Sequence, residues 1–292
     1  EYMLRGLPAD IYLRLDTPDG PKYDWQTIVA GGNDWSLGNN MNNPSARVVD
    51  LNDNLDDMRF WFYGFPEGGQ HYDEIYRLDY QNYSDTTVNS INAYYPPGKF
   101  QEYRLSIREY TDAENNNYTY YQSTYGDLPT EYSRMDADFD YINDSPIDFE
   151  LSVTGSEALE IVSYWYMYDS DYNYGYWDVY GPSDYASYTL PEIPGYISTS
   201  SLIDRENYEQ TGVNLIGHSN LDSYYDILEL IFESPDLYYN VADDVRTRYK
   251  YPINSSVNRQ NIGSDIFTPD YDKLIGDPIY KHYKRKQERQ TK

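Results

Sequence analysis

The sequence of 292 residues contains no cysteine and only three histidines. The absence of cysteine excludes disulfide bonds, thiolate metal sites, iron–sulfur clusters and a cysteine nucleophile. Three imidazoles leave little material for histidine chemistry. No apolar run approaches the roughly 18 residues that a membrane-spanning helix needs, so the sequence predicts no transmembrane segment.

Basic residues are scarce as well. The chain has 22 Lys and Arg against 49 Asp and Glu, which gives a formal net charge of −27 and an isoelectric point near 4.2. A nucleic-acid backbone and an anionic membrane surface both attract basic faces. We therefore expect no nucleic-acid partner. Lys and Ala, which favour helices, number only 8 and 9.

Tyrosine is the residue in greatest excess, with 38 copies, and 33 of the acidic residues are Asp. Tyr and Trp favour half-buried strands, whereas Asp and Asn favour turns and loops. Each Tyr or Trp ring can bury on the order of 150–250 Å² while its polar end stays in water. The composition therefore predicts a folded, mainly β chain whose core is rich in tyrosine and tryptophan.

Short strand patterns separated by turn residues run through the first half of the chain. Residues 58–65 form a strongly aromatic pattern, and residues 100–110 alternate between apolar and polar side chains. Turn signals rich in Pro, Gly and Asp separate such segments every 8–15 residues. This spacing is typical of an antiparallel sandwich or barrel, and we expect one such unit over residues 1–146.

A second β unit is predicted over residues 147–280. Residues 149–153 alternate, and residues 159–168 form a long aromatic strand pattern. One helix is expected at about 223–233, with Asp222 as its cap and an apolar stripe along one face. The predicted fold is thus two antiparallel β-sandwich- or barrel-like units, with one short C-terminal helix and a basic tail.

The basic tail spans residues 281–292 and carries six basic residues and one acidic residue, a net charge of +5. Its basic residues are Lys281, Lys284, Arg285, Lys286, Arg289 and Lys292. Such a segment is attracted to the acidic body of the protein, to an acidic neighbour or to anionic lipid headgroups. We expect it to act as a docking element.

Aromatic residues of the second unit form the candidate ligand or interface site. They are Tyr164, Trp165, Tyr166, Tyr176 and Trp177. Exposed rings beside polar groups would stack on sugars, and Tyr and Trp are also enriched in protein interfaces. The same pattern arises when one strand face is core and the other carries cross-strand aromatic pairs. The sequence leaves these three interpretations open.

Runs of carboxylates suggest calcium, which takes hard oxygen ligands. The best candidate set lies around a predicted hairpin turn and comprises Asp169, Asp171, Asn173 and Asp178. A further run, Asp136-x-Asp138-x-Asp140, would place three carboxylates on one strand face. They would repel one another unless a cation or an arginine lies between them. No other cofactor is indicated.

The segment from Gly217 to Leu221 resembles a nucleophile elbow, G-x-S-x-G between a strand and a helix, with Ser219 as the nucleophile. Leu221 replaces the final glycine of that motif, and the only histidine after Ser219 is His282. A serine hydrolase is therefore a remote alternative. We expect the protein not to be an enzyme, and we assign no catalytic residue.

The acidic, Lys-poor, Tyr- and Asn-rich composition resembles that of secreted or outer-surface proteins of Gram-negative bacteria, although a salt-adapted source gives a similar signature. We expect an exported protein, associated with the cell surface or outer membrane or extracellular, that acts by binding. The leading hypothesis is a structural or accessory subunit of an outer-surface protein assembly. The alternative is a glycan-binding surface protein of a polysaccharide-uptake system.

Overall fold

The computed structural model describes residues 9–28, 41–55, 57–66, 76–84, 86–112, 117–143, 145, 147–168, 174–192, 205–233 and 245–250. Within these residues the chain is mainly β, with one α-helix, α1 (Tyr224–Glu233), and a short 3-10 helix, η2 (Arg205–Asn207). The strands are β1 (Ala9–Thr17), β2 (Gly20–Ile28), β3 (Ser45–Leu55), β4 (Met58–Phe65), β5 (Tyr76–Tyr83), β6 (Val88–Tyr95), β7 (Glu102–Asp112), β8 (Asn117–Gly126), β9 (Glu131–Tyr132), β10 (Asp138–Asn143), β11 (Asp148–Thr154), β12 (Glu160–Tyr168), β13 (Tyr174–Pro182), β14 (Ser187–Thr189), β15 (Glu209–His218) and β16 (Val245–Lys250).

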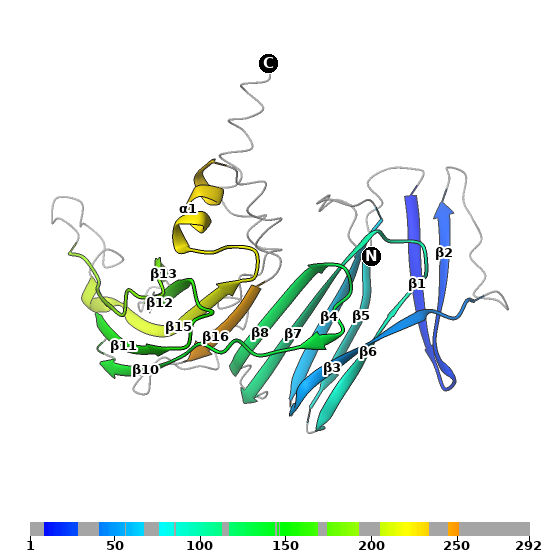
Figure 1. Ribbon diagram of the computed structural model, residues 1–292, viewed down its shortest axis with the longest axis horizontal. Helices are drawn as coiled ribbons and strands as arrows, with labels where there is room; N and C mark the ends of the chain where they lie inside the picture. The colour runs from blue at the N-terminus through cyan, green and yellow to red at the C-terminus, as the bar shows by residue number, and fades with distance from the viewer. Residues whose placement is uncertain are drawn as a thin grey trace, which may run out of the picture.

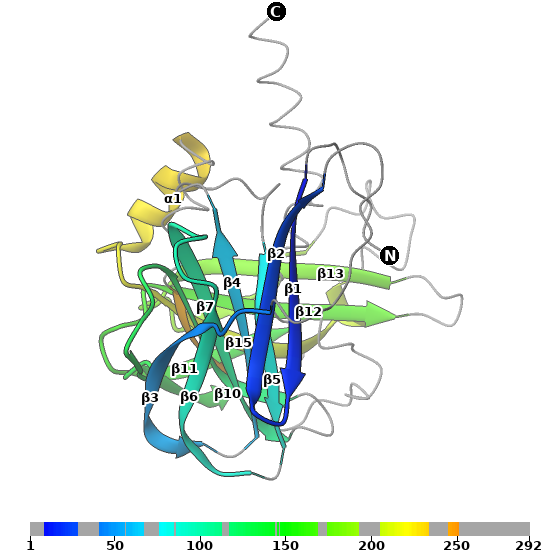
Figure 2. The same ribbon diagram turned by 90° about the vertical axis from the view of Figure 1, so that its right-hand side faces the viewer.

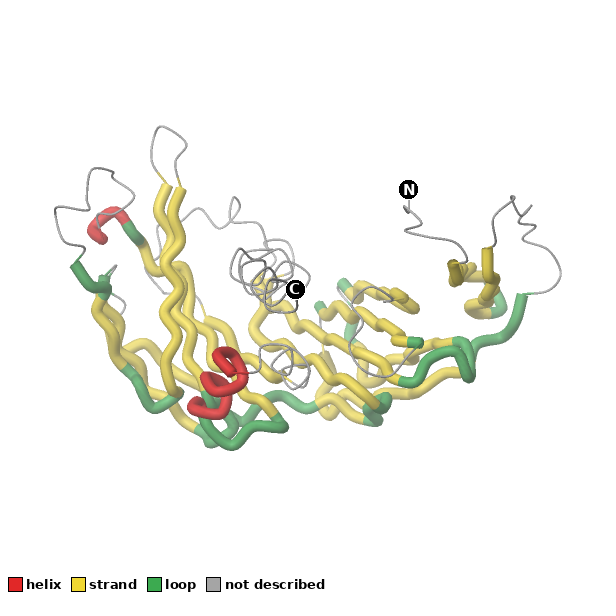
Figure 3. Tube along the Cα trace, turned by 90° about the horizontal axis from the view of Figure 1, so that it is seen from above, coloured by secondary structure: helices red, strands yellow, loops and turns green. Residues whose placement is uncertain are grey.

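One antiparallel sheet of eight strands runs through the molecule in the order β13-β12-β15-β16-β8-β7-β4-β5 (Figure 1). The strands of the N-terminal region and those of the C-terminal region meet where β16 pairs with β8. Seen from above, the strands of the two regions follow one another across the molecule (Figure 3). In Figure 2, β12 and β13 run across the direction of β4 and β5, as expected from the accumulated twist of a long sheet.

A three-stranded sheet, β6-β3-β9, forms the first hydrophobic core together with the N-terminal part of the long sheet. Alternate residues of β4, namely Met58, Phe60 and Phe62, are fully buried in this core. Gly64 continues the same face, and the ring of Phe100 lies so close that a side chain at this position would collide with it. Successive side chains of a strand point to opposite faces. Every second residue of β4 therefore packs into this core.

A second three-stranded sheet, β10-β11-β14, forms the second core with β12 and β15. Trp165 is its largest fully buried side chain, and its ring lies 5.8 Å from that of Phe149 and 6.0 Å from that of Tyr188. Leu215 on β15 completes the buried layer. The two cores thus lie along one shared sheet, and each has a sandwich-like arrangement.

The hairpin of β1 and β2 is attached to the edge of the long sheet at β5. The phenol of Tyr12 and the guanidinium of Arg14 both donate to the carbonyl of Leu78. Arg14 also forms an ion pair with Asp79, whose side chain is almost fully buried. Burial raises the pKa of Asp79 despite the opposing attraction of Arg14. This contact ties the first hairpin to the rest of the N-terminal region.

The structure confirms the mainly β, antiparallel fold and the short helix, which starts one residue later than expected. The only parallel pair among the described strands is β3 with β9. The residues of the first core end at Tyr132, and those of the second begin at Met135. The division of the chain into two units at residue 146 stays a prediction. The basic tail, residues 281–292, lies outside the described residues.

Candidate functional site

The candidate site is the face of the long sheet that points away from the first core. Strand side chains alternate between the two faces of a sheet. Because Phe60 and Phe62 occupy the core, their neighbours Arg59, Trp61 and Tyr63 lie on the opposite face. The same alternation applies to β7, β8 and β5. The result is a surface on which arginines and aromatic rings are interleaved.

The strand register arranges this surface in three rows that run across β5, β4, β7 and β8. The first arginine row comprises Arg77, Tyr63, Arg104 and Tyr125. The middle row comprises Tyr80, Trp61, Ser106 and Ser123. The second arginine row comprises Asn82, Arg59, Arg108 and Tyr121. We call these twelve residues the arginine–aromatic face.

Each of three arginines on this face lies over at least one aromatic ring. The Cζ atom of Arg108 is 4.9 Å from the ring centre of Trp61 and 5.6 Å from that of Tyr121. The Cζ atom of Arg104 is 4.8 Å from the ring centre of Tyr63. Each such contact contributes about 0.5–2 kcal/mol, more when water is excluded. The rings therefore hold the guanidinium groups in place.

Arg59 is held by two neighbours, Tyr110 and Asn82. Its Cζ atom lies 4.6 Å from the ring centre of Tyr110, and its Nη1 donates to the Tyr110 hydroxyl at 3.4 Å. Its Nε donates to Oδ1 of Asn82 at 3.1 Å. In the strand register Arg59 lies directly opposite Arg108. Like charges in this position destabilise a sheet, and ring contacts on both sides offset that repulsion.

Exposure increases across the face from β8 toward β5. Tyr121 and Ser123 on β8 are buried, whereas Arg59 and Trp61 on β4 are half-buried. On β5, Arg77, Tyr80 and Asn82 are exposed, and 44% of the Tyr80 surface is accessible. The accessible part of the arginine–aromatic face is therefore centred on β4 and β5.

Sequence patterns alone do not reveal this face. A signal was present, because arginine occupies positions 59, 104 and 108, each of which alternates with apolar residues along its strand. Recognising the site also requires knowing which strands pair, since each row joins residues as far apart in the sequence as Arg59 and Tyr121. Four of the 14 arginines of an acidic chain gather here.

The predicted aromatic site is divided between the two faces of β12 and β13. Trp165 is 1% exposed and belongs to the second core, and Trp177 packs against that core with an edge contact to Tyr208. Tyr164 and Tyr166 lie on the other face, where Tyr164 is buried and Tyr166 is half-buried. Tyr176 pairs with Tyr166 in the strand register. The two tryptophans therefore serve the core.

The calcium candidates are only partly placed by the structure. Asp169, Asp171 and Asn173 lie outside the described residues, and Asp178 lies on β13 opposite Tyr164. Among the residues that the structure describes, no cluster of three or more His, Asp or Glu side chains is arranged to hold a metal ion. A calcium site at this turn stays a prediction.

The acidic run on β10 has basic partners. Arg248 and Lys250 of β16 both form ion pairs with Oδ1 of Asp138, at 2.9 and 3.0 Å, and Lys250 also reaches Asp140 at 3.2 Å. Burial alone would raise the pKa of Asp138, but the hydrogen bonds from Arg248 and Lys250 outweigh it and lower the pKa. Asp136 instead accepts from two backbone amides of a neighbouring loop. Protein cations thus pair with Asp138 and Asp140, whereas backbone amides hold Asp136.

Ser219 lies exposed in the turn after β15. The preceding residue, His218, does not serve as a base for its hydroxyl. His218 is 6% exposed, and neither of its ring nitrogens makes a hydrogen bond. Burial lowers the pKa of His218 to about 4. Gly217, before it, packs against the carbonyl of Glu157 with no room for a side chain. The glycine of this motif has a packing role.

A buried carboxyl lies on the same face of the sheet as His218. Glu160 of β12 is 3% exposed, and burial raises its pKa to about 8. It lies opposite Ile216 in the register, two residues from His218 along β15. Tyr224, at the start of α1, is close enough that Glu160 adds to the effect of burial and raises the pKa of the phenol. Both ionisable groups are shifted toward their neutral forms.

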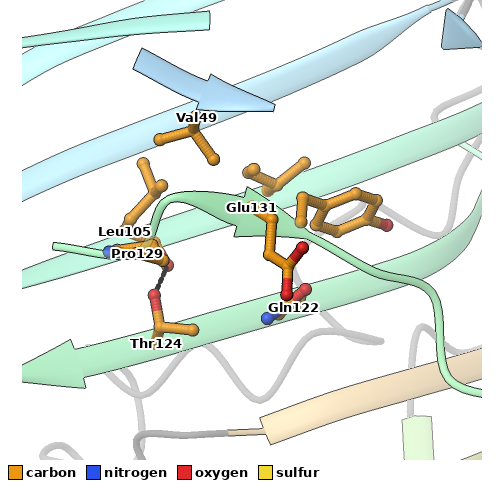
Figure 4. A pocket seen from close by; sticks show the side chains of 8 residues that line it. Val49, Leu105, Gln122, Thr124, Pro129 and Glu131 are labelled. Carbon is orange, nitrogen blue, oxygen red and sulfur yellow. Dashed lines mark hydrogen bonds between the residues drawn. The ribbon is translucent and has the colours of Figure 1, made fainter. Parts of the chain in front are cut away.

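A small pocket lies between the long sheet and β9, on the core side of β7 and β8 (Figure 4). It is lined by Val49, Leu105, Ile107, Gln122, Thr124, Pro129, Glu131 and Tyr132. Its cavity volume of about 10 Å³, roughly the room that one water molecule needs, is far below the roughly 300–1,000 Å³ typical of small-molecule sites. The arginine–aromatic face lies on the opposite side of the sheet and is not part of it.

Within the described part of the chain, no helix has the length and apolar character required to span a membrane. No family model, no curated protein and no solved structure matches the chain.

Proposed function

We propose that this protein is a non-catalytic, exported surface protein that serves as an accessory subunit of an outer-surface protein assembly. It docks to its partner through the accessible part of the arginine–aromatic face, on β4 and β5. The composition supports export and a surface location, and the interleaved arginines and rings support a binding role. The basic tail is a second docking element in this proposal.

The observation that carries the proposal is the kind of residue that the face presents. Arg, Trp and Tyr are the residues that most often dominate the binding energy of protein interfaces. Here Arg59, Trp61, Arg77 and Tyr80 lie on adjacent strands and retain accessible surface. Ring contacts hold Arg59, Trp61 and Tyr80 in place, so little conformational entropy of these side chains is lost on binding.

Two features favour a protein partner over a neutral sugar. The face is the surface of a sheet, whereas small ligands are usually enclosed in concave pockets. The rings of Trp61 and Tyr63 are also occupied by the guanidinium groups of Arg108 and Arg104. Those ring surfaces are therefore not free to stack on a sugar.

The proposal is tested by the mass of the protein extracted gently from its source, measured by size exclusion with light scattering. Four forms are compared: the full chain, the double variant R59Q/R77Q, the control variant R47Q and a chain lacking residues 281–292. Arg47 is an exposed arginine on β3, in another sheet. R47Q therefore removes one arginine charge without touching the face.

We expect a mass well above 34.4 kDa for the full chain and for R47Q, and a return to the single-chain mass for R59Q/R77Q. A single-chain mass for the full protein would overturn the proposal. Loss of the assembly only in the truncated chain would assign docking to the tail and remove the face from the proposal.

A further inference from the structure

We propose that the C-terminal segment of residues 279–286 packs onto the outward face of α1 in the same chain. Its apolar side chains cover the exposed rings of the helix, and its lysines lie beside the carboxylates next to them. The inference goes beyond the proposed function, because it states where the basic tail binds in a single chain. A partner that binds the tail then has to displace it from α1.

The outward face of α1 carries two unusually exposed apolar side chains. Tyr225 and Phe232 are 76% and 69% exposed, the highest values among the large hydrophobic side chains that the structure describes. Leu228 lies between them and is half-buried. The three residues are at positions i, i+3 and i+7 and line one side of the helix, whereas Ile227 is fully buried on the opposite side. We call Tyr225, Leu228 and Phe232 the α1 stripe.

Acidic residues lie next to the α1 stripe, and the helix contains no basic residue. Asp222, just before the helix, and Glu229, on the same side as the stripe, are both exposed. The last turn of α1 has no basic side chain to offset the partial negative charge at the C-terminal end of a helix. This surface therefore fits a segment that combines apolar side chains with positive charge.

In the C-terminal part of the sequence, only the end of the chain has this chemistry. Residues 251–280 carry four Asp against one Arg and one Lys, whereas residues 281–286 carry four Lys and Arg and no acidic residue. Ile279, Tyr280 and Tyr283 are at positions i, i+1 and i+4, the spacing of one helix face. The segment thus offers apolar side chains for the α1 stripe and cations for the carboxylates beside it.

The length of the connection favours the helix of the same molecule over that of a second copy. β16 ends at Lys250, and residues 251–278 connect it to the segment. A random coil of about 28 residues spans on the order of 30 Å, and α1 follows β15, the neighbour of β16, after a short turn. Such a linkage gives an effective concentration of about 1 mM. A second copy in dilute solution competes poorly, and its charge of −27 repels the first.

The experiment treats the purified full chain with a carbodiimide, which joins a lysine amine to a carboxylate in contact with it and adds no spacer. Mass spectrometry measures the crosslinks from Lys281, Lys284 and Lys286 to Asp222 and Glu229. Normal and nitrogen-15-labelled chains are mixed in equal amounts, so that crosslinks within one chain and crosslinks between two copies differ in mass.

Three variants test the contact while every crosslinking group stays in place. Y225S/F232S removes both exposed rings of the α1 stripe, and Tyr283→Ser removes one ring of the segment. The matched control is Ile142→Ser, which removes a 63% exposed apolar side chain from β10. Because Tyr225, Phe232 and Ile142 are all exposed, their substitution leaves the cores intact.

We expect crosslinks within one chain for the normal protein and for Ile142→Ser, and at least fivefold fewer for Y225S/F232S and for Tyr283→Ser. Surface ion pairs alone contribute little, so the charges should not hold the segment once the rings are removed. At 1 M NaCl, where the screening length falls to about 3 Å, the crosslinks should also decrease several-fold.

Three results would overturn the inference: no crosslinks from the tail to residues 222–229, equal crosslinking in Y225S/F232S, or crosslinks that join two copies. The last result would assign the α1 stripe to a second copy. The proposed function fails separately, because it is tested by the mass of the extracted protein, whereas the crosslinks are measured in the purified chain.

Discussion

On one face of the eight-stranded sheet, the ionisable side chains of the C-terminal region and those of the N-terminal region differ in burial and in charge state. In the C-terminal region, Glu160 and His218 are almost fully buried, and burial moves their pKa values to about 8 and about 4. In the N-terminal region, Arg104 is also buried but keeps its charge over the ring of Tyr63, and Arg59 and Arg77 keep contact with water. Charge persists where water or a stacked ring solvates it, and ionisation is suppressed where neither is available. The N-terminal region is therefore the one suited to recognising a charged partner.

The largest effect is expected for Glu160→Gln at high pH. The folded-state pKa of about 8 lies above the ordinary value of 4.5, so the folded protein keeps this proton as the pH rises from 4.5 to 8 and loses stability over that range. At 1.36 kcal/mol per pKa unit, the upper limit of the penalty above pH 8 is about 5 kcal/mol. Glu160→Gln should remove it. Urea unfolding at pH 4.5 and pH 9 measures this; an equal effect at both values would contradict it.

A pair of tryptophan variants compares the core with the open face. Trp165→Ala should lower the free energy of unfolding by about 3–5 kcal/mol, because the ring is 1% exposed and leaves a cavity. Trp61→Ala should cost about 1–2 kcal/mol, from partial burial and one cation–π contact. Denaturant unfolding of both variants measures the difference. Equal costs would mean that the arginine–aromatic face is packed like a core.

His218 should make the folding stability of the C-terminal region sensitive to acid. Its folded-state pKa of about 4 lies below the ordinary 6.5, so the unfolded chain takes up the proton first and stability falls as the pH drops from 6.5 to 4. His218→Phe should reduce this loss by about 2 kcal/mol at pH 5. Thermal unfolding at pH 7 and pH 5 tests the sign. An unchanged pH dependence would place His218 outside the buried layer.

The smallest effect on stability belongs to the most exposed arginine. Arg77→Gln should change the free energy of unfolding by no more than about 0.5 kcal/mol, as is usual for surface positions. Its effect should instead be on binding. A loss of several kcal/mol in urea unfolding would show that Arg77 supports the fold and would remove it from the docking surface.

Local sequence patterns predicted most of the strands and the helix at 223–233, because alternation and caps are short-range signals. They did not find β16 (Val245–Lys250), although Val245, Thr247 and Tyr249 alternate there with basic residues. This strand joins the two regions by pairing with β8, a contact between segments more than 100 residues apart. No local pattern encodes such a pairing.

The site was harder to predict than the fold for a related reason. The aromatic pattern of residues 159–168 correctly predicts a strand, but alternation places Trp165 in the core and Tyr164 on the other face. The arginines of β4 and β7 were visible only as polar positions between apolar ones. They become a site once the register sets Arg59 opposite Arg108, which single-strand periodicity does not determine.

The most direct test of docking through the arginine–aromatic face is chemical footprinting of arginines by phenylglyoxal, read by mass spectrometry. The native extract is compared with the purified single chain. Arg77 should be protected several-fold in the extract, Arg59 should follow it, and Arg47, exposed on another sheet, should react equally in both samples. Equal reactivity of Arg77 in extract and purified chain would contradict the account.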